Sequence, residues 1–179
     1  PATLGNLYVV KAHAGVSPLA LSLIRAGKIK ATYIYRDPRD ALLSAYEYGR
    51  RKREAGRSGA FSELNTIEQA IYFMKEYVQI SETWLACEQA FHTKYEDLLL
   101  GYGDETQRLL AFLDLDPEDG AIKSVIHQYQ PTKGRSDQKG THFVKGKVGR
   151  YREQLTVGEQ DLCIQFFGPY LEKMGYPNP

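Results

Sequence analysis

The chain has 179 residues, of which 42% are apolar and 25% are charged. These values are typical of a soluble protein that can bury a core, and we expect residues 1–179 to form a single domain. The formal net charge of +1 gives no overall field that would favour nucleic acid or an anionic membrane as a partner. No apolar run approaches the roughly 18 residues of a membrane span, and no signal peptide is visible. The two cysteines suggest free thiols in a reducing compartment, so we expect a cytoplasmic protein.

Strands and helices are predicted to alternate over the first part of the chain. The apolar run 7–10 predicts a buried strand, and Ser17-Pro18 begins a helix that reaches about Ala26 and stops at Gly27. Residues 31–35 alternate and are rich in aromatic and β-branched side chains, which predicts a second strand. This order predicts an α/β sheet with parallel strands, and ligands of such sheets gather at the carboxyl ends of the strands.

Further elements are predicted towards the C-terminus. A long amphipathic helix over 66–89 carries an apolar stripe that we interpret as core. A third strand is predicted over 91–95, and three further helices over 105–113, 117–129 and 157–174. Residues 130–150 have no periodicity, and such a long irregular segment is typically functional or disordered.

Arg36 follows the second predicted strand and stands at the start of a helix. Asp37 is a good N-cap, Pro38 suits the first helical position, and Asp40 stands where a capping-box acid would. Ser44 lies two turns along the predicted helix, on roughly the same helix face as Asp37 and Ala41. A guanidinium, a hydroxyl and free helix N–H groups favour a phosphate site. The alternative is a surface Arg–Asp pair beside an ordinary turn.

Three more clusters carry groups of chemical interest. Lys11 and His13 fall on the same side of a strand end, where a histidine suits a general base or is merely structural. Tyr95 follows the third strand and either contacts a base or caps the core. Residues 143–150 combine glycines with lysines, which indicates either an anion-binding loop or a flexible basic one.

Other patterns argue against alternative functions. The basic run 50–60 is typical of a solvated helix end, while a nucleic-acid patch or a mobile loop stays open. Cys87 and Cys163 lack a partner spacing and are predicted to be buried free thiols, and no metal-ligand spacing is present. A Walker A loop is absent, because residues 140–147 are followed by Val148 where Ser or Thr should stand.

The order of these clusters resembles that of cytosolic-type sulfotransferases, which use PAPS (3′-phosphoadenosine 5′-phosphosulfate). Lys11-Ala12-His13 resembles their Lys-Thr-His segment, and residues 35–40 with Ser44 resemble their 3′-phosphate-binding motif. Residues 95–98 are similar to their Tyr-Glu-Asp segment, and residues 144–149 to their Arg-Lys-Gly-x-x-Gly loop. The similarity extends from about Leu7 to Tyr176.

The resemblance implies a P-loop-NTPase-like α/β fold, with a parallel sheet flanked by helices. It implies transfer of a sulfuryl group from PAPS to a hydroxyl or amine of a small acceptor. His13 would take the proton of the acceptor and Lys11 would neutralise charge around the transferring group. Residues 152–161 echo the dimerisation motif of the family, which implies a homodimer.

The resemblance also assigns the contacts to PAPS and its product PAP. Arg36 and Ser44 would hold the 3′-phosphate, Tyr95 would lie on the adenine side, and Lys145 with Gly146 would return to the same phosphate. Several cationic groups around a polyanion are chemically coherent. Sulfuryl transfer, like phosphoryl transfer, depends on positioning and on stabilisation of spread negative charge.

The sequence also departs from the family pattern. The first strand and the P-loop segment of the type Pro-Lys-Ser-Gly-Thr-Thr, which holds the 5′-phosphosulfate, are missing, and Val144 stands in place of the usual arginine. Two functions therefore stay open: an active sulfotransferase, and a non-catalytic module that binds a 3′-phosphoadenosine nucleotide or dimerises. The third hypothesis is a protein that binds nucleic acid through residues 50–57, and it predicts that the affinity for oligonucleotides falls steeply with salt concentration.

Overall fold

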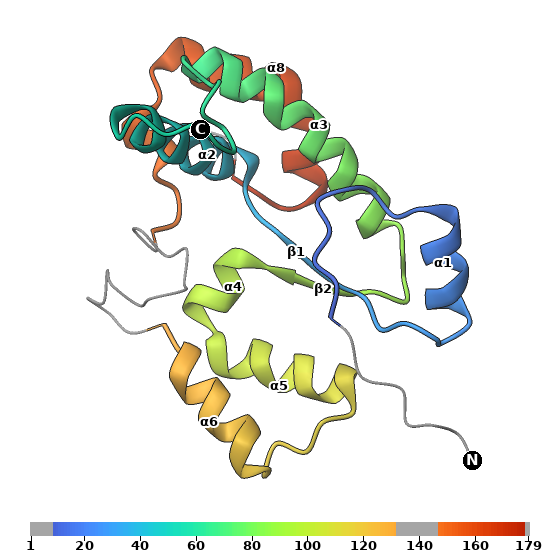
Figure 1. Ribbon diagram of the computed structural model, residues 1–179. Helices are drawn as coiled ribbons and strands as arrows, with labels where there is room; N and C mark the ends of the chain where they lie inside the picture. Colours follow the sequence, from blue (N-terminus) through green and yellow to red (C-terminus); the bar gives the residue numbers. More distant parts are fainter. Residues whose placement is uncertain (1–8, 132–146, 178–179) are drawn as a thin grey trace.

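The computed structural model describes residues 9–131 and 147–177. Helices and strands follow one another along the chain as Figure 1 shows. The strands are β1 (Thr32–Tyr35) and β2 (Phe91–Lys94). The helices are α1 (Pro18–Arg25), α2 (Pro38–Glu54), α3 (Ile67–Leu85), α4 (Tyr95–Leu100), α5 (Tyr102–Leu113), α6 (Gly120–Tyr129), α7 (Tyr151–Gln154) and α8 (Val157–Lys173).

The two strands pair in parallel and lie between two groups of helices. Thr32 stands opposite Phe91, and Tyr35 stands opposite Lys94. Helices α2, α3 and α8 lie on one side of the strands, and α4, α5 and α6 lie on the other (Figure 1). Because the strands run in the same direction, their carboxyl ends meet at one edge, where α2 and α4 begin.

The main core fills the space between α2, α3 and α8. Its fully buried members include Leu42 from α2, Ile71 from α3 and Phe167 from α8. Burying one such side chain contributes roughly 1.5–3 kcal/mol to folding, so this cluster fixes where α2 stands relative to α3 and α8. A smaller cluster under α1 contains Ile24 and Cys87.

Most predicted elements are confirmed, within a few residues. The helix predicted over 66–89 ends earlier, at Leu85. There the chain turns, with the Cys87 N–H donating to the Trp84 carbonyl oxygen, and this turn buries Cys87 in the smaller cluster. Both cysteines are buried and free, as predicted. Within the described residues, no helix is both long and apolar enough to cross a membrane.

The strand predicted over 7–10 is not found in its described part. Val9 and Val10 have no regular structure and are 92% and 85% exposed. The reason is that no described strand offers them a hydrogen-bonded ladder, and an apolar run forms a buried strand only when it is paired and covered. The other two residues of the run lie outside the described part of the chain.

Candidate functional site

Helix α2 begins directly after β1, and two residues make the turn. Asp37 is the N-cap: its Oδ1 accepts a hydrogen bond of 2.9 Å from the Arg39 backbone N–H. Pro38 occupies the first helical position, where the missing N–H is not needed. The predicted start of α2 is thus confirmed, and Arg36 stands at the carboxyl end of β1 beside it.

The Arg36 guanidinium is largely buried, yet it donates no hydrogen bond to any described residue. Its side chain is 19% exposed, and its Nε atom is buried without a hydrogen-bond partner. The guanidinium carbon lies 4.4 Å from the centre of the Tyr95 ring. The nearest acid is Asp40, with 3.8 Å between Arg36 Nη2 and Asp40 Oδ2, too long for a hydrogen bond. The predicted alternative, a surface pair, does not describe this arrangement.

Arg39, by contrast, is fully buried and donates from its Nε and Nη2 to protein acceptors, while its Nη1 has no partner among the described residues. Its Nε and Nη2 donate to the two oxygens of Asp37 at 3.0 and 2.7 Å, and Nη2 also donates to the Pro177 carbonyl oxygen at 2.9 Å. Its guanidinium stacks on the ring of Tyr151 at 3.9 Å. Burial acts to lower the pKa of Arg39, but the hydrogen bond and charge of Asp37 outweigh it and the pKa is raised.

The carboxylate of Asp40 does not form the capping box that its position predicted. It accepts hydrogen bonds from two other backbone N–H groups, that of Gly149 at 2.6 Å and that of Tyr151 at 3.1 Å. The Asp37 N–H that a capping box would use is bound instead by Oε1 of Glu96, at 3.1 Å. Both groups of the expected capping box, the Asp40 carboxylate and the Asp37 N–H, are therefore bound by residues distant in the sequence.

The end of β2 supplies the opposite side of the site. Tyr95 opens α4 and stacks on Arg36, and burial, its largest influence, raises the pKa of Tyr95 while the charge of Arg36 opposes that rise. The next residue, Glu96, is buried and its Oε2 accepts a hydrogen bond from the Tyr176 hydroxyl at 3.3 Å. Since Glu96 also binds the Asp37 N–H, it ties the end of β2 to the start of α2.

Ser44 lies one turn beyond Asp40 on α2 and is exposed. Its hydroxyl makes no hydrogen bond with another described residue. Because residues four apart share a helix face, Asp40 and Ser44 lie on the same side of α2, and Arg36 approaches Asp40 from the residue before the N-cap. Arg150 binds Glu47 on the next turn, so the segment that follows Lys147 packs along the same helix.

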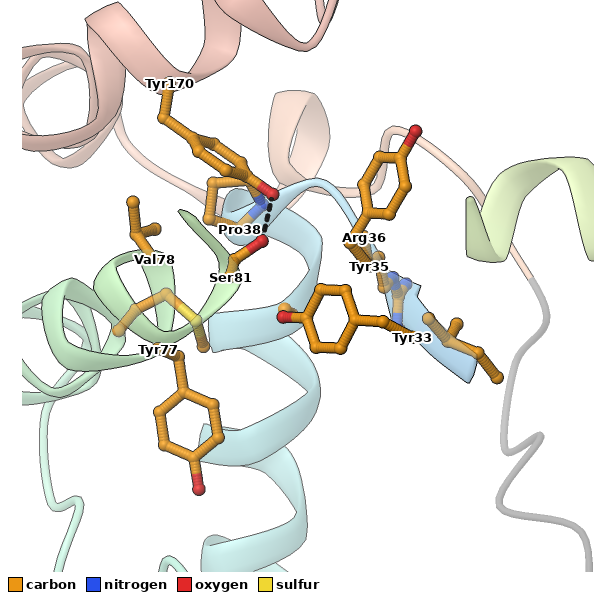
Figure 2. A pocket seen from close by; sticks show the side chains of 11 residues that line it. Tyr33, Tyr35, Arg36, Pro38, Tyr77, Val78, Ser81 and Tyr170 are labelled. Atoms are coloured by element: carbon orange, nitrogen blue, oxygen red, sulfur yellow. Dashed lines mark hydrogen bonds between the residues drawn. The ribbon is translucent and has the colours of Figure 1, made fainter. Parts of the chain in front are cut away.

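A cavity of about 160 Å³ opens beside Arg36. Figure 2 shows Tyr33, Tyr35 and Arg36 on one side of it. Across from them lie Val78 and Ser81 of α3 with Tyr170 of α8, and the Ser81 and Tyr170 hydroxyl groups are 2.8 Å apart. Most of its wall is aromatic or apolar, so the cavity suits an apolar group placed next to a cation.

The model of the sulfotransferase domain matches residues 2–175 of this chain. The chain belongs to the sulfotransferase family. Sulfotransferase 4A1 of mouse and of rat are each 24% identical to it over 154 residues, and that of human is 22% identical. The alignment covers 83% of this chain and 53% of each relative, so the chain spans about half the length of the curated relatives it matches.

A solved structure supports the fold assignment. Mouse sulfotransferase SULT7A1, crystallised in complex with PAP, superposes with a TM-score of 0.61 at 15% sequence identity, covering 92% of this chain and 69% of that one. At this identity the likeness concerns the fold alone. The predicted α/β, P-loop-like fold of this sulfotransferase domain is confirmed.

The predicted site residues of the sulfotransferase domain fall into three groups. Arg36 and Tyr95 are in contact, and Ser44 lies on the same side of α2. Lys11 and His13 are exposed and make no hydrogen bond or ion pair with a described residue. Their segment is held at the end of α3, where Trp84 Nε1 donates to the Ala14 carbonyl oxygen at 2.9 Å. Lys145 and Gly146 lie outside the described residues.

Three residues that shape the site were not predicted to do so: Arg39, Glu96 and Tyr176. One sequence signal was available for Glu96, because an acid directly after a parallel strand lies at the edge where the next helix begins. Among the residues that the structure describes, no three His, Cys, Asp or Glu side chains are grouped as a metal site would require.

Proposed function

We propose that this domain binds PAPS by its 3′-phosphate and transfers the sulfuryl group to a hydroxyl or amine of a small acceptor. The observation that carries the proposal is the state of Arg36, a guanidinium that is four-fifths buried and gives no hydrogen bond to a described residue. Leaving a buried donor such as its Nε unbonded is unfavourable, and a ligand that accepts from the guanidinium would remove this cost. A phosphate provides charged acceptor oxygens in the geometry that arginine prefers.

The groups around Arg36 fit a phosphorylated nucleoside. Ser44 offers an exposed hydroxyl on the Asp40 side of α2, and the proposal assigns it to the 3′-phosphate with Arg36. Tyr95 offers an aromatic ring on the adenine side. Lys145 and Gly146 are proposed to return to the phosphate, and the segment after them is bound to α2 through Gly149 and Asp40.

The reaction itself moves a sulfuryl group between two oxygen atoms, or from oxygen to nitrogen. The bond from sulfur to the phosphate oxygen of PAPS breaks, the bond from sulfur to the acceptor atom forms, and PAP leaves. We assign His13 to accept the proton of the acceptor and Lys11 to neutralise charge on the transferring group. We expect this reaction in the cytoplasm, where buried thiols such as Cys87 and Cys163 stay reduced.

Calorimetry with PAP tests the nucleotide site. Replacing the arginine in Arg36→Ala removes charge-assisted hydrogen bonds to phosphate, and we expect PAP to bind about 10- to 100-fold more weakly. The matched control is Arg25→Ala, an exposed arginine in the last turn of α1, which should bind PAP as the unaltered chain does. If the unaltered chain binds no PAP, or if Arg36→Ala binds it equally well, the proposal is wrong.

Turnover separates the enzyme from the non-catalytic alternative. That alternative is a PAP-binding or dimerisation module, and it is favoured by Lys11 and His13 being exposed and bonded to no described residue. Transfer of label from PAPS to a phenol or an amine supports the enzyme, and His13→Ala should lower the rate about 100-fold or more. Binding of PAP without any transfer supports the module.

We also propose that residues 152–161 form a homodimer contact. Val157 stands at the start of α8 and is 76% exposed, although it is apolar. Thr156 is occupied locally, because its side chain and that of Glu159 form a capping box. Light scattering at several concentrations should show a dimer that Val157→Lys converts to a monomer. A monomer at every concentration would contradict this proposal.

A further inference from the structure

One carboxylate, that of Asp40, connects the two segments on which the proposed phosphate site depends. The side chain is fully buried in the first turn of α2. Its Oδ1 accepts the N–H of Tyr151, and its Oδ2 accepts the N–H of Gly149. The same Oδ2 lies 3.8 Å from Arg36 Nη2. Three groups from two distant parts of the chain therefore meet at one side chain.

The two hydrogen bonds from the backbone fix a turn that needs special geometry. Gly149 has a φ of +75°, a conformation that glycine adopts without strain. Its N–H and that of Tyr151 both point at Asp40, and a carboxylate can accept both because it has two oxygen atoms. The turn is thereby held against α2, next to Arg36.

The position of the Arg36 guanidinium depends on Asp40 in a different way. Asp40 attracts it from one edge without accepting a hydrogen bond, and Tyr95 covers one flat face. The guanidinium is oriented while its donors give no hydrogen bond to a described residue, which is what a preorganised anion site requires. A closer ion pair between Arg36 and Asp40 would occupy these donors. Without Asp40, the Arg36 side chain would be free to rotate.

We propose that Asp40 is a positioning residue for binding of a 3′-phosphate: it sets the Arg36 guanidinium and the Gly149 turn in place and does not touch the phosphate. This inference rests on the proposed function. The negative charge of the Asp40 carboxylate by itself repels a phosphate, so Asp40 favours phosphate binding only through the groups that it holds in place.

The test compares two nucleotides that differ in the 3′-phosphate. Asp40→Asn keeps the size of the side chain, but it removes the charge and places an NH₂ group opposite one of the two backbone N–H donors. We expect PAP to bind about tenfold more weakly, while adenosine 5′-phosphate, which lacks the 3′-phosphate, binds as before. If the chain turns over PAPS, its KM should rise by the same factor at unchanged kcat.

Two controls keep the result interpretable. Asp114→Asn alters an exposed carboxylate that pairs with Lys30 before β1, at the opposite end of the strand, and should leave both affinities unchanged. In a chain that already carries Arg36→Ala, adding Asp40→Asn should weaken PAP binding by clearly less than about tenfold, because the part of the effect that acts through Arg36 is already lost and only the part that acts through the Gly149 turn is left.

The outcomes separate this inference from the proposed function. If the unaltered chain does not bind PAP, both fall. If it binds PAP but Asp40→Asn weakens both nucleotides equally, or neither, Asp40 is a structural residue and only this inference is overturned. If circular dichroism shows that Asp40→Asn is unfolded, Gly149→Ala strains the same turn from the other side. That variant must then lose PAP selectively, and unchanged PAP affinity overturns the inference.

Discussion

Replacing Arg39 by methionine should destabilise the chain strongly. The guanidinium is fully buried and gives two hydrogen bonds to Asp37 and one to the Pro177 carbonyl oxygen. Asp37 is itself only 4% exposed. Arg39→Met leaves that carboxylate buried with no described cation at hydrogen-bond distance, and breaking a buried pair in this way lowers stability by about 3–5 kcal/mol. Such a loss is a large part of the stability of an ordinary domain.

Urea unfolding followed by fluorescence measures this loss. Trp84 is the single tryptophan and stacks on Tyr33, so its emission should report on the folded sheet. The matched control is Arg50→Met on the same helix, because Arg50 pairs with Glu54 in an exposed position. We expect the control to change the free energy of unfolding by less than about 1 kcal/mol. The dependence on urea concentration should stay the same in both variants.

A double variant tests the reason for the loss. Asp37→Asn keeps a good N-cap but removes the charge that Arg39→Met would strand. Combined with Arg39→Met, it should therefore recover much of the lost stability. The reasoning is refuted if Arg39→Met is as mild as Arg50→Met, or if the double variant is less stable than Arg39→Met by the full effect of Asp37→Asn.

Two further predictions concern packing and pH. In Gly49→Ala the added Cβ would lie 2.0 Å from the Phe61 carbonyl oxygen, so we expect a loss above about 2 kcal/mol, whereas Gly103→Ala, in open space, should be neutral or stabilising by up to about 1 kcal/mol in thermal unfolding. Burial raises the pKa of Cys163 to about 12 and also raises the pKa of Tyr176, so the folded chain keeps protons that the unfolded chain releases. The contribution of these two groups to the free energy of unfolding should be constant well below pH 9 and should fall as the pH rises towards 12. In urea unfolding, Tyr176→Phe should make this fall less steep above about pH 10, by roughly 1.4 kcal/mol per pH unit.

The local signals of the sequence were sufficient for the start of the site. Asp37 and Pro38 are short-range helix-start signals, and they placed α2 and left Arg36 at the end of β1. The alternation of strand and helix patterns predicted that β1 and β2 run in parallel, which they do. These features depend on residues within one or two turns of each other, and that is the range over which sequence patterns are informative.

Partners distant in the sequence explain where the predictions failed. Asp40 was expected to bond to the N-cap three residues away, but its acceptors are used by Gly149 and Tyr151, more than a hundred residues along the chain. The N-cap N–H is bound by Glu96 instead. No local rule distinguishes an acid that caps its own helix from one that binds another segment, because both need a carboxylate in the first turn.

The charges of residues 36–40 divide between the proposed phosphate contact and internal pairing, and the geometry of a helix start explains this division. Residues two apart inside a helix do not face each other, but Asp37 is the cap and stands outside the helix, so its carboxylate reaches back to Arg39. That pair is internal and cannot serve a ligand. Arg36 precedes the cap, stacks on Tyr95 and lies 3.8 Å from Asp40, so it gives no hydrogen bond to a described residue. The motif has two arginines, and of these only Arg36 gives no hydrogen bond to a described residue, so the proposed phosphate contact is assigned to Arg36 alone. Arg36→Ala should accordingly weaken PAP binding with little change in the free energy of unfolding. Arg39→Met should lower the free energy of unfolding, but at urea concentrations where it is still folded it should bind PAP with little change in affinity.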